Sequence, residues 1–134
     1  MDFNDTPDEA AFRKEVRAWL DANATRKSDD KQSFRAGNDD PELLAKAKAW
    51  QAKKAEAGYA RMTWPKEFGG RGATPIEKVI WQQEEGVYGK LTQPFQIGEG
   101  MCGPTVMAFC SEAHKRHYLP NLASGAHIWC PRFS

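Results

Sequence analysis

The chain has 134 residues, 28% of them charged, and a formal net charge of +1. This length suits one domain with a sizeable hydrophobic core, and the balanced charge excludes the whole-domain basic bias of a nucleic-acid-binding protein. No apolar run approaches the roughly 18 residues of a membrane span, and the acidic N-terminus lacks the basic and apolar regions of a secretory signal. The three cysteines lack the spacing of a disulfide framework, so a reducing cytoplasm is the expected location.

The first predicted helix begins at Thr6. The Thr6 hydroxyl can accept a hydrogen bond from the backbone N–H of Glu9, whose carboxylate can accept one from the backbone N–H of Thr6. Apolar residues then recur on one face until the pattern fades near Asn23. Residues 25–40 show no apolar period and are expected to form a loop.

A second helix is predicted after Asp40, with Gly58 suited to its end. Residues 58–73 hold four of the eleven glycines and are expected to form a shaped loop. Three aromatic residues should anchor it: Tyr59, Trp64 and Phe68. Its glycine run, residues 67–72, could be interpreted as a phosphate cradle. However, no strand precedes it and no Gly-Lys-Ser/Thr follows, so a turn with positive φ angles is favoured.

Three more helices are predicted in the C-terminal half. Thr74 repeats the capping pattern with Glu77. The third helix is expected to bury one apolar stripe, formed by Ile76, Val79, Ile80 and Val87. Three glycines should form a turn before a fourth, mostly apolar helix, which starts at Pro104 and should be buried from several sides. A fifth helix should be capped by Ser111 and ended by Gly125.

These patterns predict an all-α fold, an antiparallel bundle of about five helices with a short extended C-terminal tail. Residues 1–127 would form the helical domain. Residues 128–134, IWCPRFS, are typical of a first strand, so the chain is expected to be a helical fragment that stops where a β-domain would begin.

Three candidate sites have a simpler structural interpretation. His114 and His117 could share a metal ion, but no third donor accompanies them and a solvated basic face is favoured. Glu84 and Glu85 could be an acid–base pair, but adjacent helical residues do not face each other. Cys110 could be a nucleophile, but no histidine–acid arrangement is evident and a small buried residue is favoured. No catalytic residue, metal site or disulfide framework is therefore assigned.

The segment Gly100–Met107 is the most credible functional stretch. Its glycines permit close approach, and Thr105 with two methionines suits the wall of an apolar ligand pocket. Ordinary core packing is the alternative, and the chemistry of the residues alone favours it.

Three blocks of sequence have a specific character: FNDTPDEAAFRKEVRAWL, AGYARMTWPKEFGGRGATPIEKVIWQQE, and GMCGPTVM followed by SEAHKRHYLPNLASGAHIWC. They resemble the N-terminal domain of flavin-dependent acyl-CoA dehydrogenases, whose signature Trp-Pro-x-Glu-Tyr/Phe-Gly-Gly-x-Gly is matched by WPKEFGGRG. The resemblance covers nearly the whole chain, and the segment 25–40 is its weak part.

The resemblance implies an FAD enzyme that oxidises an acyl-CoA thioester to its 2,3-enoyl-CoA. A glutamate removes the α-proton while the β-hydrogen passes as hydride to the flavin, and neither this glutamate nor most of the FAD site is expected in this chain. The N-terminal domain forms one side of the acyl channel. The residues expected to bind the substrate there are Gly100, Met101, Gly103, Thr105 and Met107.

The C-terminal tail is implied to run past the flavin, where Phe133 and Ser134 match cofactor-binding positions of the family. Two residues depart from the family pattern. Pro131 removes a backbone N–H that a strand or the flavin could use. Cys110 stands where the family usually has a glycine in a left-handed turn, a conformation that costs a cysteine about 1 kcal/mol.

The first hypothesis is therefore the N-terminal domain of an acyl-CoA dehydrogenase, inactive alone and not expected to hold FAD by itself. Its expected partners are the acyl-CoA substrate in the complete enzyme and other dehydrogenase subunits, with no nucleic acid and no membrane span. The alternative is a non-catalytic helical interaction module that pairs with a fuller dehydrogenase subunit, because its channel-facing and domain-facing surfaces would be apolar and exposed.

Overall fold

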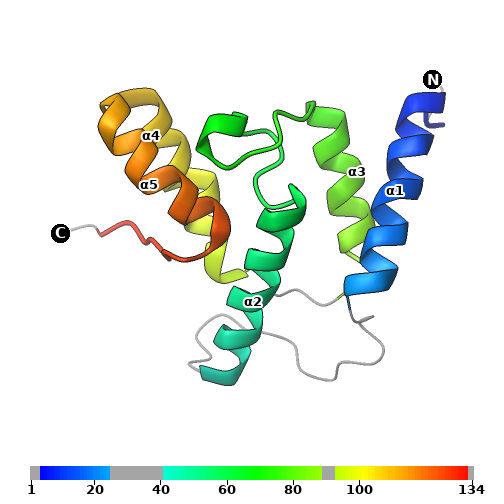
Figure 1. Ribbon diagram of the computed structural model, residues 1–134, viewed down its shortest axis with the longest axis horizontal. Coiled ribbons are helices and arrows are strands. Elements are labelled where there is room, and N and C mark those ends of the chain that lie inside the picture. Colours follow the sequence, from blue (N-terminus) through cyan, green and yellow to red (C-terminus); the bar gives the residue numbers. More distant parts are fainter. Residues whose placement is uncertain (1–3, 25–40, 89–92, 133–134) are drawn as a thin grey trace. The chain divides into compact units, whose positions relative to one another are not determined.

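The computed structural model describes residues 4–24, 41–88 and 93–132. In these ranges it contains α-helices and no strand, so the predicted all-α class is confirmed (Figure 1). The five α-helices are α1 (Pro7–Asn23), α2 (Pro41–Ala57), α3 (Pro75–Glu85), α4 (Gly103–Phe109) and α5 (Glu112–Ser124). Two 3₁₀ turns (Lys66–Phe68 and Gln93–Phe95) and one π-turn (Gly98–Cys102) complete the helical structure. None of these helices combines the length and the apolar character that crossing a membrane requires.

The helix ends follow the predicted chemistry. Thr6 and Thr74 each accept from the backbone N–H three residues on and form a complete capping box with the glutamate there. Ser111 caps α5 in the same way without the glutamate. Gly58 and Gly125 follow α2 and α5 with φ angles of 85° and 77°, a left-handed conformation that glycine adopts at little cost.

The chain divides into two compact units, one formed by Met1–Ser33 with Thr74–Lys90 and the other by Phe34–Ala73 with Leu91–Ser134. In the first unit α1 and α3 lie side by side (Figure 1). Arg13 and Arg17 reach Glu84, and Asp21 accepts a hydrogen bond from Tyr88, so the two helices run in the same direction. An antiparallel arrangement was expected for helices joined by short links. Because α1 and α3 are not consecutive in the sequence, that expectation does not apply to this pair.

The buried side of α3 differs from the predicted stripe. Ile80 is buried as expected, but three other predicted members are exposed: Ile76, Val79 and Val87. The stripe instead runs through Ile80, Trp81, Glu84 and Tyr88, which are all buried. The buried positions of α3 are therefore shifted by about one residue from the predicted ones. The shifted face includes Trp81, whose ring centroid lies 5.9 Å from that of Trp19 on α1.

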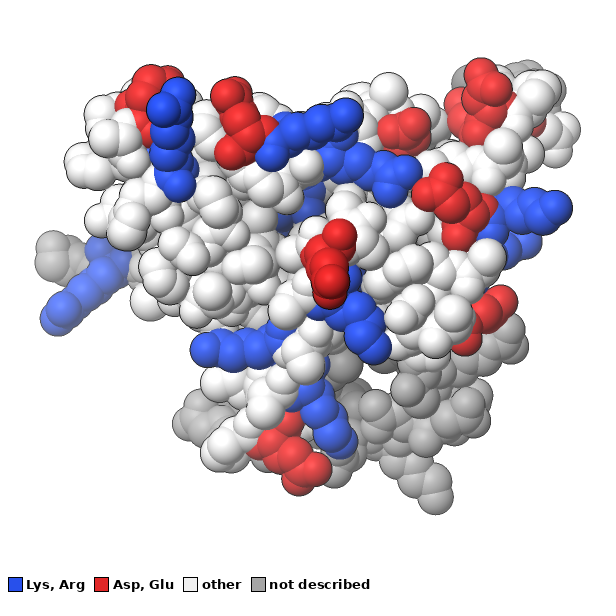
Figure 2. Space-filling model, viewed as in Figure 1, with Lys and Arg blue, Asp and Glu red and all other residues white. Residues whose placement is uncertain are grey.

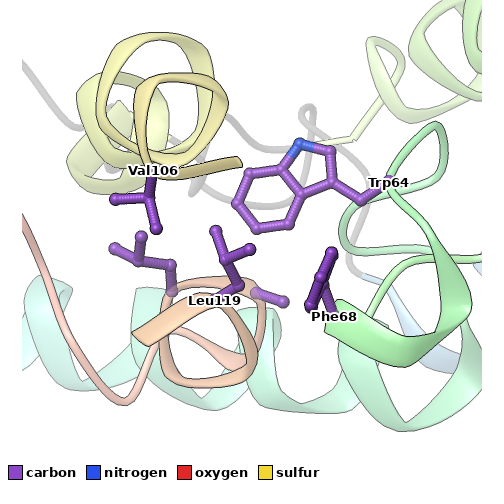
Figure 3. Close-up of a cluster of buried hydrophobic side chains, with 6 residues drawn as sticks. Trp64, Phe68, Val106 and Leu119 are labelled. Carbon is purple, nitrogen blue, oxygen red and sulfur yellow. The ribbon is translucent and has the colours of Figure 1, made fainter. Parts of the chain in front are cut away.

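The second unit has its core where the loop 58–73 meets α4 and α5. The predicted anchors Tyr59, Trp64 and Phe68 are buried. Figure 3 shows Trp64, Phe68, Val106 and Leu119 pointing toward one another from these three segments, in a cluster that also includes Leu122 and Ala123. Aromatic residues of an irregular loop thus cover the buried face of α5.

The glycine run is a tight turn, as predicted. Gly69 and Gly72 have φ angles of 91° and 66°. A Cβ atom on Gly70 would lie 2.0 Å from the carbonyl oxygen of Trp64, which accepts a hydrogen bond from the N–H of Gly72. The glycines therefore let the chain fold back on its own backbone.

Two side chains from outside α5 donate hydrogen bonds to backbone carbonyls at its C-terminal end. Gln51 of α2 donates from Nε2 to the carbonyl of Ala123 at 3.0 Å. Arg61 of the loop donates from Nη2 to the carbonyl of Leu122 at 3.4 Å. The carbonyl of Ala123 thus gains a partner from α2, and the carbonyl of Leu122, which also accepts from the N–H of Gly125 at 3.4 Å, gains a further one from the loop.

The tail after α5 is neither helix nor strand over residues 126–132. Trp129 packs against the core cluster, and its ring contacts that of Tyr118 edge-on, with 5.1 Å between the ring centroids. Phe133 and Ser134 lie outside the described residues. A domain boundary between residues 127 and 128 stays a prediction.

Candidate functional site

The π-turn and α4 form one continuous helical segment, residues 96–109. Its three glycines were expected to make a turn ahead of α4. Instead the N–H of Gly103 donates to the carbonyl of Gly98, five residues back, and the backbone keeps helical φ and ψ angles at Ile97, Cys102 and Gly103. π-turns are rare and occur frequently at functional sites. The segment is therefore the first place to look for a site.

The inner side of this segment packs closely on the second unit. Gly98, Gly103 and Val106 are buried. A Cβ atom on Gly103 would lie 2.3 Å from Cη2 of Trp64, and one on Gly98 would lie 3.2 Å from Cδ2 of Leu122. A side chain at position 103 would overlap the indole of Trp64, whereas one at position 98 would make a tight contact with Leu122.

The outer face of the segment is defined here by Ile97, Met101, Thr105 and Phe109, which recur every four residues. Ile97 is 41%, Met101 53% and Phe109 85% exposed. The Thr105 hydroxyl donates to the carbonyl of Met101 at 2.7 Å, so it too is satisfied within the helix. The outer face carries no charged side chain, and the expectation that α4 is buried from several sides is wrong for Phe109.

The predicted substrate-binding residues divide between the two sides. Met101 and Thr105 belong to the outer face, and Gly100 is exposed beside them. Gly103 is buried, and Met107 is partly buried against the core cluster. Of the five predicted residues, Gly100, Met101 and Thr105 are thus placed to contact a ligand on the outer face. Their role in binding stays a prediction.

Arg61 is the residue of this region that sequence reasoning missed. It is 3% exposed, and its Nη1 lies 2.5 Å from Oε2 of Glu99 in the π-turn. Its guanidinium carbon lies 5.7 Å from the centroid of the Trp64 ring. A buried arginine in an irregular loop leaves no periodic pattern, but one signal was present: Glu99 is the only charged residue between positions 91 and 111.

The carboxylates of Glu84 and Glu85 do not form an acid–base pair. Glu84 accepts hydrogen bonds from Arg13 at 2.8 Å and Arg17 at 2.7 Å, which hold α1 to α3. Glu85 accepts from Nε1 of Trp81 on its own helix. Glu84 is therefore a structural group of the first unit.

We expect Glu84→Gln to lower the free energy of unfolding by about 1.5 kcal/mol at neutral pH, because the three charge-assisted hydrogen bonds from Arg13 and Arg17 weaken. Burial acts to raise the pKa of Glu84, but the hydrogen bonds and charges of Arg17 and Arg13 outweigh it and lower the pKa. The contribution of Glu84 is thus present above its unfolded pKa of about 4.3 and is lost as pH falls through the folded value.

Urea unfolding at several pH values measures this effect. The difference between wild type and Glu84→Gln should shrink as the pH falls below about 4. Glu85→Gln is the control, since a glutamine oxygen can still accept from Trp81. A constant difference at all pH values would contradict the assignment.

The remaining candidates have structural surroundings. His114 and His117 are exposed, and each ring contacts that of Tyr118. Among the described residues, no three histidine, cysteine or acidic side chains are grouped as metal ligands would be. Cys110 is partly buried against the core cluster with φ −88°, so it does not adopt the left-handed conformation implied by the resemblance. Among the described residues seen in Figure 2, basic and acidic side chains lie interspersed.

Comparison with known proteins gives one consistent result. Residues 6–126 match the protein family described as "Acyl-CoA dehydrogenase, N-terminal domain". Acyl-CoA dehydrogenase IpdE1 of Mycobacterium tuberculosis is 29% identical over 126 residues, 92% of this chain and 32% of the relative. Acyl-CoA dehydrogenase FadE26 of the same organism is 26% identical, covering 90% of this chain and 29% of the relative. The chain thus spans about a third of the length of the curated relatives it matches.

Solved structures share the fold. The ChsE4–ChsE5 complex from Mycobacterium tuberculosis contains a chain with a TM-score of 0.65 and 23% identity, covering 93% of this chain and 30% of that one. A structure described as "Tcur3481-Tcur3483 steroid ACAD" gives a TM-score of 0.68 at 23% identity, covering 96% of this chain and 32% of that one.

Proposed function

This chain belongs to the acyl-CoA dehydrogenase family, and from that premise we propose that it is the N-terminal helical domain of an enzyme that dehydrogenates an acyl-CoA thioester at its 2,3-bond. The observation that carries the proposal is the uncharged outer face. Apolar side chains on a helix that the core holds in place suit contact with an acyl chain. The outer face then forms one wall of the acyl channel, with Gly100, Met101 and Thr105 nearest the substrate.

The family is generally FAD-dependent, and the resemblance implies that the C-terminal tail runs past the flavin. Trp129 packs inward on the helical core, and Pro131 has no backbone N–H to donate. The described tail therefore offers a flavin no backbone N–H at position 131. Phe133 and Ser134 stay proposed cofactor contacts in the complete enzyme, where flavin would accept the hydride and a glutamate from outside this chain would take the α-proton.

The chain alone should therefore be inactive. Purified protein mixed with an acyl-CoA and an electron-accepting dye should give no dye reduction, and its spectrum should lack the visible band of an oxidised flavin. Co-expression with dehydrogenase subunits of its own organism should restore both signals. The acyl-CoA panel should include straight chains and a steroid-ring thioester, since one structural neighbour is described as a steroid ACAD. Turnover by the chain alone would refute the proposal, and so would the absence of both signals with every subunit.

A second candidate function is a non-catalytic module that pairs with a fuller dehydrogenase subunit. Phe109 favours it, because an aromatic side chain that is 85% exposed at the end of α4 is typical of a partner contact. One structural neighbour is itself described as a complex of two proteins, ChsE4 and ChsE5. A cytoplasmic location fits both candidates and stays a prediction.

We expect Phe109→Ser to weaken binding to such a subunit by about tenfold or more, as truncation of an aromatic interface anchor does. Its effect on the free energy of unfolding should stay within about 0.5 kcal/mol, because the side chain is exposed. Sedimentation of the chain with candidate subunits measures the first quantity and urea unfolding the second. Ala108→Ser, one residue away and also exposed, is the matched control. A wild-type chain that sediments as a monomer with every subunit would contradict this second candidate.

A further inference from the structure

Three segments of the second unit meet at the guanidinium of Arg61. Nη1 binds the carboxylate of Glu99 in the π-turn, and Nη2 reaches the carbonyl of Leu122 at the end of α5. The arginine side chain is 2% exposed and that of Glu99 32%. The loop, the π-turn and α5 are therefore connected through one buried charged group.

Stability alone is a weak explanation for this arrangement. Removing an arginine from water carries a desolvation cost that an ion pair often only offsets, and apolar side chains of similar volume commonly serve as well in such positions. The carboxylate of Glu99 also sits within a π-turn, which has poorer intrinsic stability than an α-helical turn. The ion pair between Arg61 and Glu99 is therefore better explained by its effect on the geometry of the π-turn than by a gain in stability.

The geometry in question is the alignment of the outer face. A π-turn holds one residue more than an α-helical turn, and each residue rotates a helix by about 100°. If the segment lost the π-turn, Thr105 and Phe109 would rotate by about that angle relative to Ile97 and Met101. Residues four apart in an uninterrupted α-helix are offset by about 40°, so the four side chains would then spread over about 120° instead of a narrower stripe.

We propose that Arg61 is a positioning residue: its ion pair with Glu99 holds the π-turn and thereby keeps the outer face aligned. The proposal rests on the proposed function only for the identity of the ligand, an acyl chain. The alignment itself follows from contacts within the second unit.

Amide hydrogen exchange measured by NMR on the full chain tests the first step. In Glu99→Gln, which keeps the shape of the side chain and removes its charge, exchange at the Gly103 amide should accelerate about tenfold, because this amide makes the π-turn hydrogen bond. The Leu122 amide within α5 should change much less. Arg61→Met should have the same effect, and Glu99→Gln decides the matter if Arg61→Met does not fold.

Arg71→Met is the matched control, since Arg71 belongs to the same loop but stacks over Tyr59, 4.9 Å from its ring centroid. It should leave exchange at Gly103 unchanged. If Glu99→Gln accelerated amide exchange equally at Gly103 and Leu122, the ion pair would contribute only to global stability, and the proposal would be overturned. Unchanged exchange at Gly103 would overturn it as well.

Binding of an acyl-CoA with a pyrene-labelled acyl chain tests the second step. Glu99→Gln should raise the Kd about tenfold relative to wild type, and Arg71→Met should not. Equal affinity of Glu99→Gln and wild type, with Gly103 loosened, would overturn the link between π-turn and outer face. A wild-type chain that fails to bind the probe would count against the proposed acyl-binding wall, while the exchange experiment would still decide the role of Arg61.

Discussion

Replacing Leu119 with alanine should lower the free energy of unfolding by about 2–5 kcal/mol. Leu119 is fully buried in α5 and lies in the cluster with Trp64, Phe68 and Val106. Truncation removes apolar surface from the core and leaves a cavity that an aromatic loop and two helices cannot easily close. Urea unfolding followed by tryptophan fluorescence measures the loss, because Trp64 borders the site.

Leu44→Ala provides the matched control for this substitution. Leu44 lies on α2 of the same unit with its side chain exposed, so the same chemical change should cost less than about 1 kcal/mol. If the two variants unfolded at the same urea concentration, the core of the second unit would have been assigned incorrectly.

Gly103→Ala should also be strongly destabilising, by about 3 kcal/mol, at the upper end of overpacking effects. The new Cβ would lie 2.3 Å from both Cη2 and Cζ2 of Trp64 and 3.0 Å from the carbonyl oxygen of Gly98. Relief requires a shift of the buried indole or of the π-turn, and each change disturbs the core. Urea unfolding gives the magnitude, and near-ultraviolet circular dichroism reports the displaced indole.

Gly100→Ala is the control within the same helical segment. A Cβ on Gly100 meets no heavy atom within 4 Å, and its φ angle is not positive. Alanine should therefore stabilise the helix here, by about 0.5–1 kcal/mol. Equal effects of the two alanine variants would show that the contact with Trp64 is not the constraint at Gly103.

Local rules predicted the fold well because its helix ends depend on neighbouring residues. The threonine caps, Gly58 and Gly125 could all be located from a few adjacent positions. The face of α3 could not, because Trp81 and Glu84 are buried through partners on α1, far away in the sequence. An amphipathic pattern therefore predicts that a helix forms more securely than it predicts which side of that helix is buried.

The helical form of the candidate segment was not predicted, and its role in binding stays a prediction. Glycines and methionines pointed to residues 100–107, yet glycines ordinarily indicate a turn, and a π-turn has no sequence pattern of its own. Arg61 was missed because its importance comes from Glu99 and Leu122, which only the folded chain brings to it. The uncharged stretch around Glu99 was the one available hint.

The side-chain capping of α5 by Gln51 and Arg61 has a consequence for cooperativity. The end of this helix is completed by groups that arrive only when α2 and the loop have docked. A synthetic peptide containing α5 alone should consequently fray at its C-terminus while its serine-capped start stays more ordered. Secondary and tertiary structure of the second unit should therefore melt in a single step, with no populated state in which α5 stands complete by itself.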